Sequence, residues 1–133
     1  MSEELDLWQQ TLAAEHAAIW VYGLVGATTS MALPAEAALR VHRERRTRCV
    51  DEVVALGGQP NTSAPAYDVA APTNPTEASD LAATVEQSCT VVYAALAGAA
   101  GKGSRLLAAQ WLRESAIAMW GWDGELPVLP GLE

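Results

Sequence analysis

Hydrophobic residues recur three and four positions apart along most of the chain, the spacing that gathers side chains on one face of an α-helix. Four such runs cover residues 3–28, 35–57, 76–98 and 103–120. The second run stops at Gly57 and Gly58, and Gly98 closes the third, as expected at helix ends. The pattern predicts four helices and no strand, and it places Trp111 and Ile117 on the inward face of the fourth helix.

The segment 59–75 separates the second and third runs and is rich in proline, asparagine, serine and threonine, which favours extended backbone. Its 17 residues far exceed the usual connection between neighbouring helices of a bundle. Fully extended, it reaches about 55 Å, whereas the second helix is roughly 35 Å long. Because the segment can return along the whole bundle, we predict one domain over residues 1–133. That domain is an all-α four-helix bundle with a long Pro-rich crossover between parallel second and third helices.

Composition and charge narrow the classes of function. The chain has 8 basic and 16 acidic residues, and its formal charge of -8 argues against a nucleic-acid binder. Polar residues interrupt every apolar run and the acidic start does not resemble a secretion signal, so we expect neither a membrane span nor export. Cys49 and Cys89 lie within helical patterns, which predicts buried thiols in a reducing cytoplasm rather than a disulfide framework.

Each predicted helix carries ionisable residues on or beside its apolar face. Antiparallel pairing of neighbouring helices brings Glu15 and His16 level with Arg46, and Glu86 level with Glu114. Buried charges must be paired, metal-bound or neutralised. The sequence therefore predicts a polar network inside the bundle, made of Glu15, His16, His42, Arg46, Glu86 and Glu114, with Arg45 at its edge.

The opening LAAEHAAIWVYGLVGA, followed by LRVHRERR, resembles a small branch of the ferritin-like superfamily to which no function is assigned. In ferritin-like di-iron sites, helices one and three each supply a Glu, and helices two and four each supply a Glu-x-x-His. The resemblance implies that Glu15, Glu86 and Glu114 occupy three of the glutamate positions. Neither Glu-x-x-His is present, because Ile117 follows Glu114 and no glutamate of the second helix precedes a histidine at that spacing. These departures count against iron storage and oxygen activation.

Three functions from different classes remain open. The leading interpretation is a non-catalytic structural or partner-binding module without a cofactor, in which Arg46 is the internal cation that bridges the carboxylates. The alternative is a degenerate metal-binding protein or metal-dependent oxidoreductase, with one Fe, Mn or Zn ion held by the three glutamates and a histidine. The third is a binder of a small ligand that uses the polar centre and Trp111.

A second apolar stripe on the opposite side of the first helix indicates a partner. The stripe includes Leu7, Val21 and Val25. Closed two-fold dimers are the commonest oligomers, so a homodimer formed through the first helix is the simplest hypothesis. Cover by the crossover or tail of the same chain is the alternative.

The second helix also gathers five arginines between residues 40 and 48. Such a cluster can bind RNA or another anionic partner. In a helix, however, the run is spread around the circumference, and Glu44 lies within it. We therefore favour a solvated face together with internal pairing.

Overall fold

The computed structural model describes residues 2–123, and within this range it contains four α-helices and no strand. The helices agree with the predicted runs to within three residues at every end. A single 3₁₀ turn, η1 (Thr29–Met31), separates the first two. The helices are α1 (Glu3–Gly26), α2 (Ala32–Ala55), α3 (Pro75–Ala99) and α4 (Lys102–Asp123). The prediction of an all-α four-helix bundle is confirmed.

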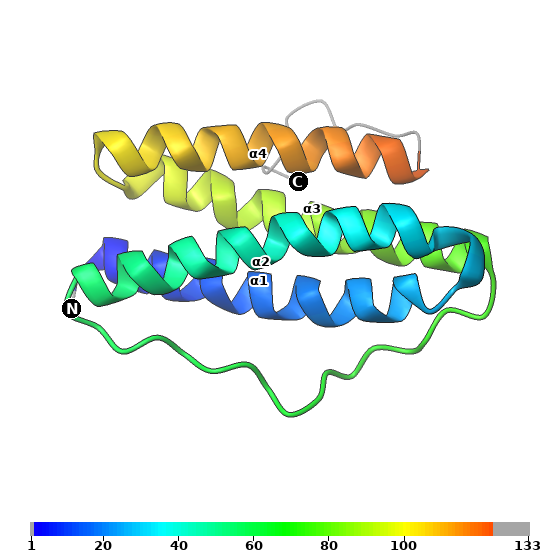
Figure 1. Cartoon of the computed structure of the whole chain (residues 1–133). Coiled ribbons are helices and arrows are strands. Elements are labelled where there is room, and N and C mark those ends of the chain that lie inside the picture. Colours follow the sequence, from blue (N-terminus) through cyan, green and yellow to red (C-terminus); the bar gives the residue numbers. More distant parts are fainter. Residues whose placement is uncertain (1, 124–133) are drawn as a thin grey trace.

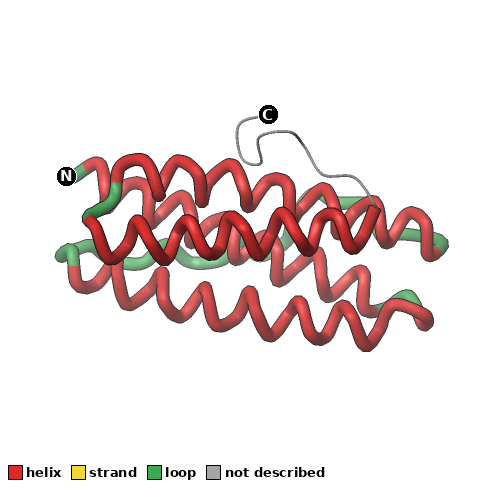
Figure 2. Tube along the Cα trace, turned by 90° about the horizontal axis from the view of Figure 1, so that it is seen from above, coloured by secondary structure: helices red, strands yellow, loops and turns green. Residues whose placement is uncertain are grey.

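The chain forms two antiparallel helix pairs, α1 with α2 and α3 with α4 (Figure 1). The segment 56–74 runs the length of the bundle from the end of α2 to the start of α3, so α2 and α3 point the same way. The predicted crossover is therefore present. Viewed from above, it passes under the helices as one extended strip of loop (Figure 2).

Local sequence signals fix the two ends of the crossover. At its start, the amides of Gly57 and Gly58 donate to the carbonyls of Val54 and Val53, a pattern that closes α2. Gly57 has a φ of 83°, which glycine adopts without steric cost. At its end, the side chain of Asn74 accepts a hydrogen bond from the amide of Glu77 at 2.9 Å. The crossover is thus bounded by a helix stop and a helix start.

The core contains side chains of all four helices, and α1 packs against both α2 and α3. Because α1 has two helix neighbours, its apolar surface must be wide. Val21 and Val25 are therefore buried in the core of this chain, and Leu7 is partly buried against it. The prediction that Val21 and Val25 form an exposed dimer stripe is wrong.

Two other expectations concern side-chain burial. Ile117 was placed on the inward face of α4, but its side chain is 61% exposed, so this prediction is wrong. The reason is that α4 packs on α3, whereas its backbone does not contact α2, and its buried face is narrow. Cys49 and Cys89 are buried free thiols, as predicted. Among the described helices, none is both long and apolar enough to cross a membrane.

Candidate functional site

The centre of the bundle holds a histidine between two carboxylates. His42 Nδ1 lies 2.6 Å from Glu15 Oε1, and His42 Nε2 lies 2.9 Å from Glu86 Oε2. All three side chains are buried, and they come from α2, α1 and α3. Since an ionised carboxylate only accepts hydrogen bonds, both ring nitrogens donate, which requires the protonated imidazolium. His42 is therefore a buried cation bridging two anions.

The pKa shifts agree with this assignment. Burial lowers the pKa of His42, but its hydrogen bonds to Glu15 and Glu86 outweigh burial and raise it from the ordinary 6.5 to about 9. Burial raises the pKa of Glu86, but hydrogen bonds from His42 and Tyr22 hold it below the ordinary glutamate value. Both groups are consequently charged near neutral pH.

Two tyrosines extend the centre by crossing between α1 and α3. Tyr22 of α1 donates to Glu86 of α3, and Tyr93 of α3 donates to Glu15 Oε2 of α1 at 2.5 Å. In each helix the tyrosine follows the glutamate by seven residues, which places both on the same face two turns apart. Trp122 Nε1 donates to the Tyr22 hydroxyl at 3.1 Å. Neither hydroxyl was predicted from the sequence, although the repeated spacing from Glu to Tyr indicates that both helices carry the pair on one face.

The second internal cation is Arg45, which joins α2 to α3 and α4. Its guanidinium donates to the Tyr93 hydroxyl at 3.1 Å, to Ser115 Oγ at 2.9 Å and to Glu114 Oε1 at 2.9 Å. It also lies 5.2 Å from the centre of the Tyr93 ring and 5.7 Å from that of Trp111. Its side chain is only 5% exposed. Arg45 is therefore the polar link across the side of the bundle where the backbones of α2 and α4 stay apart.

This arrangement corrects the prediction for Arg46. Successive residues of a helix are about 100° apart, so Arg45 and Arg46 point to opposite sides of the inward face of α2. Arg45 faces α4, where Ser115 and Glu114 accept its hydrogen bonds. Arg46 is half-buried on the other side, next to the crossover. The internal cation is Arg45, and the prediction of Arg46 is wrong.

The other predicted members divide between the centre, its edge and the outside. Glu15, His42 and Glu86 are brought together as expected. Glu114 belongs only to the edge, because its side chain is 43% exposed while it pairs with Arg45. Its pKa is raised by burial but lowered more by hydrogen bonds from Gln110 and Arg45. His16 lies outside the network, since its Nε2 donates to the carbonyl of Asn61 at 3.0 Å.

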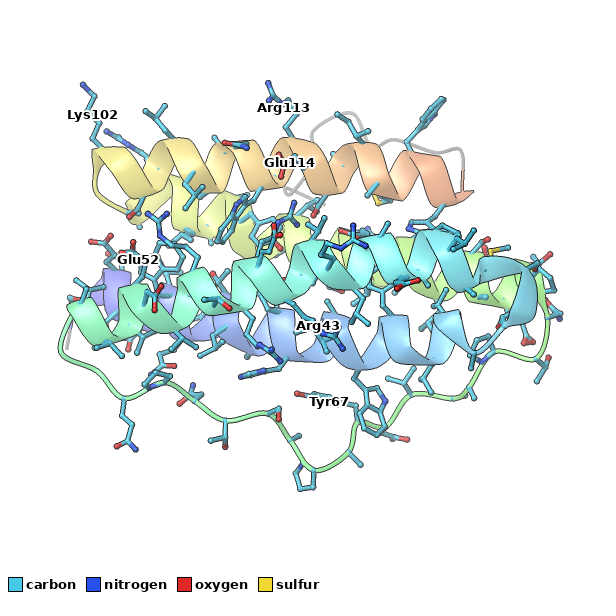
Figure 3. The ribbon with its side chains drawn as sticks, viewed as in Figure 1. Arg43, Glu52, Tyr67, Lys102, Arg113 and Glu114 are labelled. Atoms are coloured by element: carbon cyan, nitrogen blue, oxygen red, sulfur yellow. The ribbon has the colours of Figure 1, made fainter. Side chains whose placement is uncertain are left out.

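A cleft of about 520 Å³ between α2 and α4 leads to this centre. Arg45, Glu114 and Trp111 line it, and His42 and Glu86 lie at its base. Arg45 of α2 and Glu114 of α4 pair across this cleft, and Figure 3 marks Glu114 on α4. Glu86 Oε1 is buried without a hydrogen-bond partner among the described residues. This cleft gives access to the polar centre on the side where Arg45 spans two helices.

The described residues define an all-α four-helix bundle with a buried charged centre. The chain belongs to the family described as Domain of unknown function (DUF4439), whose model matches residues 8–133. It is similar in structure to a conserved hypothetical protein, rv2844, from Mycobacterium tuberculosis, with 26% sequence identity and a TM-score of 0.86. That similarity covers 95% of this chain and 94% of the other. No curated protein matches the chain.

Proposed function

We propose that this protein is a non-catalytic, ferritin-like module with a structural or partner-binding role, in which protonated His42 and Arg45 take the place of a metal centre. The observation that carries the proposal is the bridge from His42 to both Glu15 and Glu86. A di-iron bundle neutralises its inward glutamates with metal ions. Here two side chains of the same helix supply that positive charge.

The donor set does not fit a two-metal centre. On α2, His42 and Arg45 stand three residues apart, the spacing at which a di-iron helix carries its Glu and His ligands. The guanidinium of Arg45 offers only donors and cannot ligate a cation. On α4, Glu114 is half-exposed and already bound to Arg45, and Ile117 points to solvent. We derive no redox step for this centre.

A partner-binding role is supported by the outer face of α4. Three large apolar side chains are exposed there, namely Leu106, Ile117 and Trp120. Their spacing of eleven and three residues places them along one side of the helix. We propose that a second copy of the chain covers this face, so that the homodimer forms through α4 and not α1. Both cysteines are free, which suits a reducing compartment, and we propose a cytoplasmic location.

Sedimentation analysis tests the homodimer. Replacing Ile117 with Lys places a charge in the proposed interface, so a dimer of the unchanged chain should become a monomer without loss of the helical signal in circular dichroism. Leu33→Lys is the matched control, because Leu33 is also highly exposed but lies on α2. A monomer in the unchanged chain, or a dimer in Ile117→Lys, would contradict the proposal.

A mononuclear metal site is the second candidate, and one observation favours it. Ligand atoms of Glu15, His42 and Cys89 lie within 4.8 Å of one another, and all three residues are buried. A thiolate, an imidazole and a carboxylate together suit Zn²⁺. Binding would require His42 and Cys89 to lose protons, and burial raises the pKa of the Cys89 thiol well above its ordinary value. This cost favours the metal-free centre.

Metal analysis distinguishes the two functions. The protein is purified without chelator or a metal affinity column and then incubated anaerobically with ferrous, manganous or zinc ions. We expect no stoichiometric metal after desalting, and the same melting temperature with and without EDTA. One metal per chain, retained by the His16→Ala control but lost in Cys89→Ala, would reject the metal-free function in favour of the mononuclear site.

A further inference from the structure

A cavity of about 620 Å³ lies beneath the crossover, on the opposite side of α2 from the cleft that leads to the charged centre. Figure 1 shows the crossover bowing away from α1 near its middle, and Figure 3 marks Tyr67 on that stretch. The cavity is lined by His16 and Arg46, the two residues that the sequence predicted for the charged network but that lie outside it. Its chemistry comes from His16, Trp20, Arg46, Thr62, Ser63 and Tyr67.

The walls of this cavity are fixed by specific contacts. The side chain of Gln9 donates to the carbonyl of Gln59 at 2.7 Å and accepts from the amide of Asn61 at 3.0 Å. His16 Nε2 donates to the carbonyl of Asn61. Further along, the rings of Trp20 and Tyr67 lie 5.7 Å apart, centre to centre. The crossover therefore contacts α1 at Gln59 and Asn61 and again at Tyr67, and the cavity between these contacts is part of the packed structure.

The cavity is positively charged although the chain as a whole carries a charge of -8. Its lining includes Arg46 and His16 and no carboxylate. Among residues 2–123, no carboxylate lies within ion-pair distance of Arg46. Arg40 and Arg43 precede Arg46 on α2, and all three arginines line a second, neighbouring pocket together with Glu36 and Glu44. Arg46 is thus a half-buried guanidinium whose charge the described residues leave unpaired.

The other residues that line the cavity suit a ligand with a flat ring. Trp20 and Tyr67 offer aromatic faces, and the hydroxyls of Thr62 and Ser63 are donors beside Arg46. A guanidinium binds the oxygens of a carboxylate or phosphate through two parallel hydrogen bonds. We propose that this cavity binds a small organic anion, a carboxylate or phosphate carried on a flat ring, with Arg46 on the anion and Trp20 and Tyr67 against the ring. This inference is independent of the proposed function, because it uses none of the residues of the charged centre.

Calorimetric titration of the whole chain with inorganic phosphate, benzoate and phenyl phosphate tests the proposal. Both ring-bearing anions should bind saturably and more tightly than inorganic phosphate, and their relative affinity identifies the preferred anion. Arg46→Gln should weaken both by about tenfold or more, the effect of losing a charge-assisted hydrogen bond. Trp20→Leu should weaken the ring-bearing anions and leave the response to inorganic phosphate unchanged.

Arg48→Gln is the matched control, because Arg48 is on the same helix but pairs with Glu52 and lines the other cleft. It should bind all three probes like the unchanged chain. Thermal melts confirm folding, which is expected since Arg46 and Trp20 are partly exposed. Absence of saturable binding of both ring-bearing anions at millimolar concentration would overturn the proposal. Equal weakening in Arg46→Gln and Arg48→Gln would also overturn it, since it would indicate general attraction to basic residues.

Discussion

Replacing His42 with Gln is expected to lower the free energy of unfolding by about 3–5 kcal/mol, the cost of removing one partner from a buried ion pair. The substitution leaves Glu15 and Glu86 buried near one another without the cation that bridges them. A glutamine amide can donate to one carboxylate but carries no charge to offset the repulsion between the two. Urea denaturation followed by circular dichroism at neutral pH measures this loss.

Two further variants decide whether charge is the cause. His16→Gln is the matched control, because His16 is half-buried and makes one hydrogen bond to a backbone carbonyl, so its loss should be about 1 kcal/mol. Adding Glu86→Gln to His42→Gln removes one of the two repelling charges and should recover part of the stability. Equal losses in His42→Gln and His16→Gln would show that His42 does not act as an internal cation.

Stability is expected to fall as the pH rises through the folded pKa of His42. The folded pKa, about 9, lies above the ordinary 6.5, so the folded state holds the proton more tightly than the unfolded state. The stabilisation is then complete below pH 6.5 and is lost progressively as the pH rises from 6.5 to 9. A shift of this size corresponds to roughly 3 kcal/mol. Urea denaturation at intervals from pH 6 to about 9.5 measures the slope.

The His42→Gln variant isolates this effect from the other groups that titrate. Burial raises the pKa values of Cys49 and Cys89, so thiols that ionise only on unfolding add an alkaline slope to every variant. Burial likewise raises the pKa values of Tyr22 and Tyr93, whose unfolded forms ionise near pH 10, which sets the upper limit of the titration. Loss of His42 also raises the pKa of Glu86, so the difference between the two proteins belongs to His42 at the alkaline end of the titration, where the carboxylates are ionised. Identical slopes in the unchanged chain and His42→Gln would contradict the assigned protonation.

The contribution of Glu86 to stability has the opposite pH dependence and is lost in acid. Hydrogen bonds from His42 and Tyr22 hold the pKa of Glu86 below its ordinary value despite burial, so its contribution is present above the unfolded glutamate pKa. That contribution is lost as the pH falls through the lower folded value. The stabilisation that the ion pair of His42 and Glu86 provides is therefore complete only in mildly acidic solution, above the unfolded glutamate pKa and below pH 6.5.

Local patterns along the chain were enough to predict the secondary structure, the crossover and part of the charged centre. Helix periodicity and glycine and proline positions report local backbone preferences, which act over a few residues and survive in any tertiary context. They placed all four helices and the long connection between the second and third helices. Glu15, His42 and Glu86 were also predictable, because each interrupts an apolar face near the middle of its helix and must meet a partner there.

Which neighbouring residues join Glu15, His42 and Glu86 depends on how the helices pack against one another. Arg45 and Arg46 flank the same helix face, and the choice between them depends on where α4 places Ser115 and Glu114. His16 turns to the crossover for the same kind of reason, since the carbonyl of Asn61 lies there. Val21 is buried because α1 has helix neighbours on two sides. Periodicity gives the direction of a side chain around its helix to within about 100°, the angle between successive residues. The partner of that side chain is set by the position of a helix distant in the sequence, which no local preference encodes.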